Sequence, residues 1–307
     1  MRAVQITSLE GPSAVEVVEV DAPEPGPDQV VIDVKAAGVS FPEVLQTRGQ
    51  YQIKPPLPFV PGSEVAGEVV SAPSGTGFST GDRVAAFPAL GGFAERVVAD
   101  TSMTFHLPDN LSYEQGAAVP LNYLTAHFGL LKRGHLRNGE SVLVQGAAGG
   151  VGTASIQVAK AFGAGQVIAV TSTDAKGEIA VAAGADAYVL ADGFRDAVKE
   201  LTGGHGVDLV VDPVGGDRFT DSLRSLKDDG RLLVIGFTAG SIPEVKVNRL
   251  LLNNLDVRGV GWGAYVLKRP GYVAAQWSEL APYLAEGKLT APIGGRFPLE
   301  DAARARA

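Results

Sequence analysis

Residues 141–152 read Ser-Val-Leu-Val-Gln-Gly-Ala-Ala-Gly-Gly-Val-Gly, and this stretch decides the fold. Its apolar run predicts a buried strand, its glycines a tight turn, and the residues after them the start of a helix. This order directs backbone N–H groups and a helix N-terminus at one point, where they can bind a pyrophosphate. Ala147, Gly149 and Gly152 occupy the three positions of the G-x-G-x-x-G pattern, with alanine in the first place.

A glycine-rich turn without a ligand is the alternative interpretation, but further strand-like and helix-like segments follow this turn in alternation. We expect strands at 141–145, 167–171, 187–190, 207–211, 231–235 and 255–260. We expect helices at 113–131, 150–162, 176–183, 194–201 and 219–226. This alternation predicts an α/β fold with a doubly wound parallel sheet of the Rossmann type, and therefore a dinucleotide site at the turn.

The N-terminal part of the chain is rich in short β-branched runs that glycine and proline separate. We expect strands at 14–20, 30–36, 64–71, 82–87 and 91–98. Many short strands at close spacing predict a barrel or a sandwich. A helix at 273–286 follows the last strand of the alternating region.

Composition narrows the possible functions. The net charge of the 307 residues is −8, which argues against a nucleic-acid partner. The chain has no cysteine, which excludes disulfides, cysteine nucleophiles and thiolate zinc ligands. The N-terminus enters a strand-like pattern without a signal sequence, and no apolar run is long enough to span a bilayer. We therefore expect a cytoplasmic protein with no membrane partner.

The residues after the second expected strand indicate the cofactor. An NAD enzyme usually places Asp or Glu there to bond the ribose hydroxyls, but this chain has Val-Thr-Ser-Thr at 170–173. Asp174 stands where a helix N-cap belongs. Ser172 and Lys176 suit the 2′-phosphate of NADPH better than a free ribose. A solvated helix charge is the alternative interpretation of Lys176.

Several ordered motifs carry a resemblance to a known family. They lie at 37–51, 61–67, 81–84, 91–95, 122–126 and 145–152. Together they resemble the zinc-free quinone oxidoreductase (zeta-crystallin-like) branch of the medium-chain dehydrogenase/reductase superfamily. The resemblance implies a GroES-like catalytic domain, formed by residues 1–120 and 262–307, and a Rossmann domain at 121–261. It also implies that Ser40 and Ser63 stand where zinc-dependent relatives have Cys and His, so we expect no metal.

The resemblance further implies the roles of individual residues. Tyr51 is expected beside the substrate pocket as the first candidate hydrogen-bond donor, with Ser40 or Asn122 assisting; a packing role is the alternative for Tyr51. Asn122 also belongs to the expected cofactor site. The other members of that site are expected to be Thr125, Ala147, Gly149, Gly150, Val151, Gly152, Ser172, Lys176, Gly236, Phe237 and Asn248.

Without a metal, the acceptor must already be electron-poor. We expect NADPH-dependent hydride transfer to a small molecule, a quinone. Reduction of the C=C bond of an enone or enoyl thioester shares the same motifs and stays open. A non-catalytic NADPH-binding protein is the alternative of another class. Simple quinone reduction can also take its protons from water.

Three further expectations concern the rest of the chain. The strand at 255–260 would leave an apolar sheet edge, which predicts a homodimer. Relatives usually continue past a segment like 297–302, so the end at Ala307 implies a shortened catalytic domain or a shortened chain. Glu64 is expected to have a structural role, as a buried charge that could pair with an arginine; general-base chemistry is the alternative.

Overall fold

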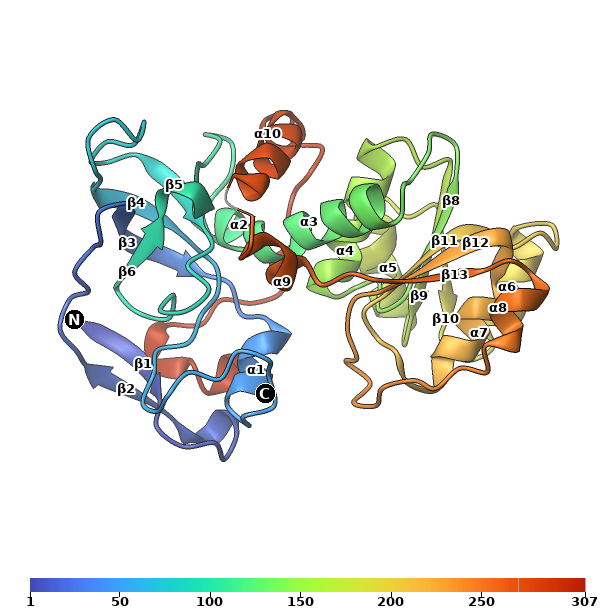
Figure 1. The fold of residues 1–307 in the computed structure, drawn as a ribbon, viewed down its shortest axis with the longest axis horizontal. Helices are drawn as coiled ribbons and strands as arrows, with labels where there is room; N and C mark the ends of the chain where they lie inside the picture. The colour runs from blue at the N-terminus through green and yellow to red at the C-terminus, as the bar shows by residue number, and fades with distance from the viewer. Residues whose placement is uncertain (270, 307) are drawn as a thin grey trace. The chain divides into compact units, whose positions relative to one another are not determined.

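The computed structural model describes residues 1–269 and 271–306, which belong to two compact units (Figure 1). The first unit comprises Met1–Leu121 and Pro270–Ala307, and the second comprises Asn122–Arg269. We expected the chain to return to the first unit at residue 262, but α9 (Trp262–Val266) still belongs to the second. Tyr265 of this helix packs against Phe128 of the same unit, with ring centroids 4.9 Å apart, which holds α9 there.

The second unit contains a six-stranded parallel sheet with the order β10–β9–β8–β11–β12–β13. Its strands are β8 (Ser141–Val144), β9 (Gln166–Thr171), β10 (Ala187–Leu190), β11 (Val207–Asp212), β12 (Leu226–Val234) and β13 (Asp256–Gly259). The order reverses between β8 and β11. In such sheets the ligand binds at the carboxyl ends of the strands, beside this reversal. The predicted doubly wound Rossmann fold is confirmed.

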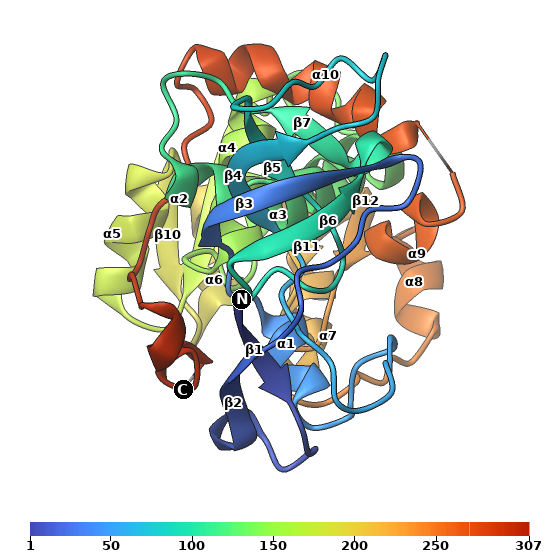
Figure 2. The same cartoon turned by 90° about the vertical axis from the view of Figure 1, so that its left-hand side faces the viewer.

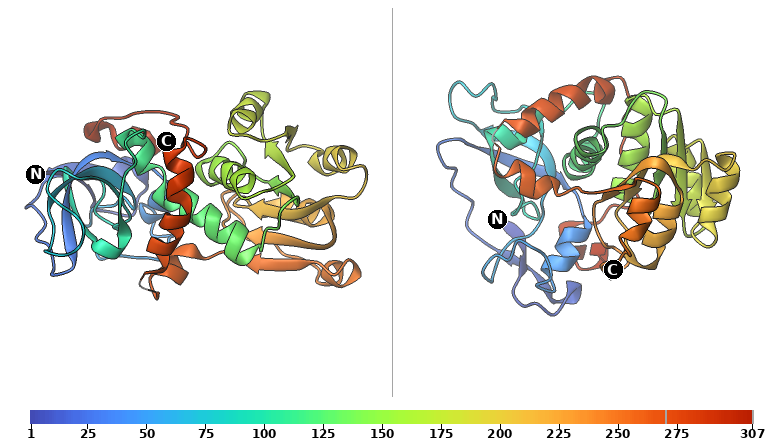
Figure 3. Two further views of the ribbon diagram at one scale, coloured as in Figure 1. Left: turned by 90° about the horizontal axis from the view of Figure 1, so that it is seen from above. Right: turned by 45° about the vertical axis from the view of Figure 1, so that its right-hand side comes forward.

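Helices cover both faces of this sheet, because right-handed crossovers on either side of the reversal place them on opposite faces. They are α4 (Gly150–Ala161), α5 (Asp174–Ala182), α6 (Phe194–Leu201), α7 (Phe219–Arg224) and α8 (Asn248–Leu252). Helices α4 and α5 contact each other, and α6 contacts α7 (Figure 3). Leu143, Ile168, Val210 and Leu232 are fully buried between these layers.

The prediction of one continuous helix at 113–131 is wrong. The structure has α2 (Tyr113–Ala117), α3 (Pro120–His127) and a π-helical segment at Phe128–Arg133. Pro120 explains the first break, because proline lacks an N–H group and disfavours helical backbone at the residue before it. Proline at the first position then starts the next helix.

The first unit contains a five-stranded antiparallel sheet with the order β6–β3–β4–β5–β7 and a separate β1–β2 hairpin (Figure 2). Its strands are β1 (Arg2–Ile6), β2 (Val15–Glu19), β3 (Gln29–Ala37), β4 (Val65–Ser71), β5 (Arg83–Ala86), β6 (Arg96–Asp100) and β7 (Thr104–His106). The strand expected at 91–98 therefore begins later. Gly91 has a φ of +89°, and a Cβ on Gly92 would lie 2.8 Å from Val65 Cγ1, so the backbone turns there instead.

The first unit also contains α1 (Phe41–Gln46) and α10 (Tyr272–Ala285), besides α2. Trp277 of α10 stacks on Phe105 of β7, with ring centroids 4.6 Å apart. This contact ties the C-terminal segment to the sheet. In the part of the chain that the structure describes, no helix has the length and apolar character needed to cross a bilayer.

Candidate functional site

The glycine turn after β8 has the predicted close-packed shape. Gly146 adopts a φ of +58°, in the left-handed region that favours glycine. A Cβ on Gly152 would lie 2.3 Å from the Gly146 carbonyl oxygen, so only glycine lets α4 start so close to the turn. Gly149 and Gly150 are exposed, which leaves the backbone open to a ligand.

Helix α4 begins at this turn and runs for 12 residues. The N–H groups of Gly150, Val151 and Gly152 lie in its first turn and have no carbonyl partner within the helix. The positive end of the helix dipole lies at the same place. Ala147 is buried and donates its N–H to the Val170 carbonyl at 3.2 Å, which ties the turn to β9. The geometry suits a phosphate group.

Asn122 lies beside this turn. A Cβ on Gly150 would be 2.7 Å from the Asn122 side-chain oxygen, so the two residues are in direct proximity. Thr125, one turn further along α3, is buried. No contact that the structure describes joins Thr125 to the turn.

The end of β9 carries a second polar group. The Lys176 ammonium donates to the Ser172 hydroxyl at 3.2 Å, and both residues are exposed. Thr173 is the N-cap of α5 and accepts the Lys176 N–H at 3.4 Å. Asp174 accepts a hydrogen bond from the Tyr188 hydroxyl at 3.1 Å. The free donors at this strand end are therefore an ammonium and a hydroxyl, which can bind a phosphate.

Sequence reasoning missed Asp212, at the carboxyl end of β11. Its carboxylate is buried and accepts the N–H groups of Val214 at 2.8 Å and Gly215 at 2.9 Å. Burial raises the pKa of Asp212, although both N–H groups and the Arg218 charge act in the opposite direction. Asp212 thus fixes the loop that leaves the sheet beside the strand reversal.

The segment after β12 packs on this loop. Thr238 N–H donates to the Pro213 carbonyl at 3.2 Å. A Cβ on Gly215 would lie 2.9 Å from a ring carbon of Phe237, so Gly236 and Phe237 border the loop. Asn248 is exposed at the start of α8, and no contact described in the structure joins it to these residues.

The first unit gathers four polar side chains around the N-terminus of α1. Ser40 is the N-cap, and its N–H donates to Glu43 at 2.9 Å, as in a capping box. The other oxygen of Glu43 accepts the Ser63 N–H at 3.1 Å and also the Ser63 hydroxyl. Glu43 is fully buried, so these three donors replace water.

Glu64 completes this group, which we call the carboxyl cluster (Ser40, Glu43, Ser63 and Glu64). Its Oε1 atom accepts the Ser40 hydroxyl at 3.1 Å, and its Oε2 atom accepts the Leu121 N–H at 2.8 Å. Burial raises the pKa of Glu64 to about 8, and the charge of Glu43 acts in the same direction. The expected arginine partner is wrong: no cation among the described residues forms an ion pair with Glu64 or lowers its pKa.

Tyr51 lies in the same unit and is half-buried. Burial raises the pKa of its hydroxyl, and the charge of Glu43 adds to this effect. The structure therefore brings Tyr51 within the electrostatic reach of the carboxyl cluster. Across residues 1–269 and 271–306, no three His, Cys, Asp or Glu side chains are grouped so that they could hold a metal ion.

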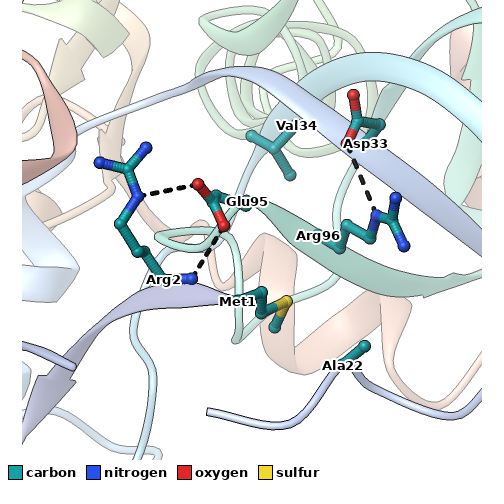
Figure 4. Close-up of a pocket in the computed structure, with 7 residues that line it drawn as sticks. All are labelled: Met1, Arg2, Ala22, Asp33, Val34, Glu95 and Arg96. Atoms are coloured by element: carbon teal, nitrogen blue, oxygen red, sulfur yellow. Dashed lines mark hydrogen bonds and ion pairs between the residues drawn. The ribbon is translucent and has the colours of Figure 1, made fainter. Parts of the chain in front are cut away.

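A surface pocket of the first unit lies near the N-terminus (Figure 4). Its charged side chains are paired with one another. Arg2 Nε contacts Glu95 at 2.8 Å, and Arg96 Nε contacts Asp33 at 3.6 Å. Because these charges already have partners within the protein, we do not place the site there.

Comparison with known proteins identifies the family. A model of the alcohol dehydrogenase GroES-like domain matches residues 26–109, and a model described as zinc-binding dehydrogenase matches residues 150–284. The chain is 40% identical to quinone oxidoreductase-like protein 2 of Mus musculus over 305 residues, which is 97% of this chain and 86% of that protein. The chain belongs to the quinone oxidoreductase family. This family lies within the medium-chain dehydrogenase/reductase superfamily, as the motifs predicted.

Solved structures of relatives agree with this family. A probable oxidoreductase from Mycobacterium abscessus is 46% identical, with a TM-score of 0.90 over 99% of this chain and 93% of that one. A quinone oxidoreductase of Escherichia coli, solved with NADPH, is 30% identical, with a TM-score of 0.88 over 100% and 95% of the two chains. The Rossmann and GroES-like architecture of the family is therefore the fold of this protein.

Proposed function

We propose that this protein is an NADPH-dependent oxidoreductase that transfers hydride to a quinone without zinc. The exposed pair of Ser172 and Lys176 at the end of β9 carries the proposal, because it offers a cation and a hydroxyl to a 2′-phosphate. Asp174 lies in the first turn of α5, and one of its carboxylate oxygens accepts a hydrogen bond from Tyr188. The NADPH complex of the Escherichia coli relative supports the same choice.

We place the rest of the cofactor site at the carboxyl ends of the strands. The turn from Ala147 to Gly152 would bind the pyrophosphate through its N–H groups. Asn122 lies at the same turn and would contact the cofactor. NADPH, when bound, supplies a hydride from its nicotinamide ring. The other residues of the proposed cofactor site are Thr125, Gly236, Phe237 and Asn248.

An acceptor oxygen gains negative charge as hydride arrives, and it needs a hydrogen-bond donor. We assign this role first to Tyr51, with Ser40 and Asn122 as further donors. The half-buried position of Tyr51 leaves part of its side chain accessible. Its raised pKa keeps the hydroxyl protonated and able to donate at neutral pH.

The side chains at the positions of the zinc ligands support chemistry without a metal. Ser40 and Ser63 offer only hydroxyl groups, and these donate to Glu64 and Glu43. Zinc sites in enzymes use thiolate, imidazole and carboxylate ligands. Chemistry without a Lewis acid would require an acceptor that is already reactive, which suits a quinone.

Two other functions use the same residues. Reduction of an enone or enoyl thioester needs the same hydride and the same donor to oxygen. A non-catalytic protein would bind NADPH and stop there. Steady-state oxidation of NADPH with a benzoquinone, an enone and an enoyl thioester separates the first two. Tight NADPH binding in calorimetry without turnover of any acceptor would establish the third.

We also propose a homodimer that forms at the outer edge of the parallel sheet. Leu255 and Val260, which flank β13, are buried, whereas Val257 within β13 is 37% exposed. Most of the exposed apolar surface here comes from α8, where Leu251 and Leu252 are 77% and 74% exposed. Burying both side chains in a second copy would remove this surface from water. Light scattering that gives the mass of a monomer would exclude the dimer.

A further inference from the structure

The loop that leaves β11 is held by a single buried oxygen atom. Asp212 is 2% exposed, and its Oδ1 atom accepts the N–H groups of both Val214 and Gly215. Gly215 has a φ of +65° and a ψ of −141°, and Gly216 has a φ of +63°. Glycine adopts such backbone readily but adopts many others as well, so the conformation must be fixed by interactions. Asp212 fixes it, because its oxygen replaces water for the buried Gly215 N–H.

This loop contacts two other segments at the carboxyl ends of the strands. A Cβ on Gly146 would lie 2.9 Å from Val214 Cγ2, so the Val214 side chain packs on the glycine turn after β8. The Thr238 N–H donates to the Pro213 carbonyl at 3.2 Å, and the Ala239 N–H donates to the Val214 carbonyl at 3.0 Å. The loop therefore joins the glycine turn to the segment that follows β12.

The proposed cofactor contacts give the direction in which NADPH lies across the sheet. Ser172 and Lys176 would hold the 2′-phosphate at the end of β9, and the start of α4 would hold the pyrophosphate after β8. In the sheet, β8 lies between β9 and β11, and β12 lies beyond β11. A dinucleotide that continues in the same direction places its nicotinamide half at the ends of β11 and β12. The loop at 213–216 and the segment at 236–239 follow these two strands.

We propose that Asp212 is a positioning residue for the nicotinamide half of NADPH. It acts through the loop at 213–216, whose conformation sets how the segment at 236–239 lies relative to the glycine turn. This role rests on the proposed function and adds to it the residue that shapes the nicotinamide end of the cofactor site. The adenosine end does not depend on Asp212, because Ser172 and Lys176 are held by contacts within β9 and α5.

This position requires a hydrogen-bond acceptor and not a negative charge. Both N–H groups bind the same oxygen, and the side-chain amide of asparagine offers an oxygen at the same distance from the backbone. Burial disfavours the charged form and raises the pKa of Asp212, whereas the two N–H groups and Arg218 act in the opposite direction. Asp212→Asn should therefore keep the loop in place, and Asp212→Ala should release it.

Calorimetry of the full-length protein with a whole and a half ligand tests the proposal. Asp212→Ala should bind NADPH about 10-fold more weakly than the wild-type protein does. Its affinity for adenosine 2′,5′-bisphosphate, which lacks the nicotinamide half, should stay the same. Asp212→Asn should bind both ligands as the wild-type protein does. The matched control is Asp217→Ala, which removes an exposed carboxylate from the same region and should change neither affinity.

The fluorescence of bound NADPH reports on the nicotinamide ring itself, because the reduced ring is the emitting group. At saturation, the spectrum of NADPH bound to Asp212→Asn should match that of the wild-type complex. The spectrum of the Asp212→Ala complex should return toward that of free NADPH. A purely structural role of Asp212 would instead weaken the binding of both ligands equally, and this result would overturn the proposal. A loss in Asp212→Asn as large as that in Asp212→Ala would also overturn it.

Val214→Ala tests the same loop through a different contact and applies even if Asp212→Ala does not fold. The substitution removes the methyl groups that pack on Gly146 but keeps the N–H group that Asp212 accepts. We expect NADPH to bind about 3-fold more weakly, with the affinity for adenosine 2′,5′-bisphosphate unchanged. Wild-type affinity for NADPH in this variant would contradict the role of the loop.

Binding by the wild-type protein separates the positioning role from the proposed function. If the wild-type protein binds neither NADPH nor adenosine 2′,5′-bisphosphate, the proposed function fails and the role of Asp212 fails with it. If the wild-type protein binds both ligands and Asp212→Ala binds NADPH equally well, the proposed function stands and the positioning role alone fails.

Discussion

The two units hold their reactive groups in different ways. In the second unit, the turn from Gly146 to Gly152 presents backbone N–H groups, and its geometry depends on the absence of side chains. In the first unit, the carboxyl cluster depends on side chains from separate segments that satisfy one another. A site made from backbone is encoded by consecutive residues, whereas a site made from side chains exists only after folding.

Among substitutions that test this comparison, we expect the largest loss of stability and binding at the turn from Gly146 to Gly152. In Gly152→Val, the new Cβ would lie 2.3 Å from the Gly146 carbonyl oxygen, and the rest of the valine side chain needs further space. Helix α4 must therefore shift. We expect a loss of about 3 kcal/mol of unfolding free energy and of measurable NADPH binding. Chemical denaturation and calorimetry provide the two measurements. Gly263→Ala, in open space on α9, is the control and should leave both unchanged.

Removal of one carboxylate from the cluster should have the next largest effect. Glu43→Ala leaves the Ser63 N–H, the Ser63 hydroxyl and the Ser40 N–H without their buried acceptor. We expect a loss of about 3 kcal/mol of unfolding free energy but unchanged NADPH binding. Urea denaturation measures the loss, with Glu24→Ala on the exposed surface as the control. An unfolding free energy equal to that of the wild-type protein would contradict the buried cluster.

The pH dependence of stability tests Glu64 directly. Its pKa is about 8 in the folded protein against an ordinary 4.5, so between these values the folded state holds a proton that the unfolded state has released. The contribution of Glu64 to the unfolding free energy is therefore complete below pH 4.5. It is lost as the pH rises from 4.5 to about 8, by at most about 1.4 kcal/mol per pH unit.

Glu64→Gln removes this loss. Between about pH 5.5 and about pH 7.5, the wild-type protein should lose about 2 kcal/mol more unfolding free energy than Glu64→Gln does. Urea denaturation at both pH values measures the difference. Parallel pH dependences in the two proteins would mean that Glu64 is ionised throughout, and the buried acid would be refuted.

The smallest effect is expected at the part of the proposed cofactor site that consists of exposed side chains. Lys176→Ala removes one cation beside Ser172, and we expect NADPH to bind about 10-fold more weakly while NADH binding stays the same. Calorimetry with both nucleotides measures the ratio. Lys199→Ala, in the last turn of α6, is the matched control. An equal loss of NADH binding would mean that Lys176 attracts both nucleotides through its charge and does not recognise the 2′-phosphate.

Sequence reasoning was accurate where the structure depends on neighbours along the chain. The bounds of β10 and α6 coincide with the prediction, because apolar runs and helical periodicity are local signals. The helix expected at 113–131 was wrong because the pattern of apolar residues outweighed Pro120 in that prediction. Helix α1 was not predicted, although the Ser40-x-x-Glu43 spacing is a capping-box signal that could have revealed it.

The carboxyl cluster could not have been predicted in the same way. Ser40, Ser63 and Leu121 reach it from separate segments, and only the folded chain brings them to the two glutamates. Glu64 was expected to pair with an arginine because buried charges usually need a counter-ion. The structure satisfies the group with hydroxyl and N–H donors instead, which is a tertiary arrangement that spacing does not encode.

The exposure of Ser172 and Lys176 has a consequence for work with this protein in solution. A charge that faces water is screened by dissolved ions, over a Debye length of about 8 Å at physiological ionic strength. Preference for the phosphorylated over the unphosphorylated nucleotide should therefore shrink as salt is added, while attachment of the pyrophosphate to the helix end changes less. Discrimination between the two nucleotides would thus depend on the medium as well as on the polypeptide.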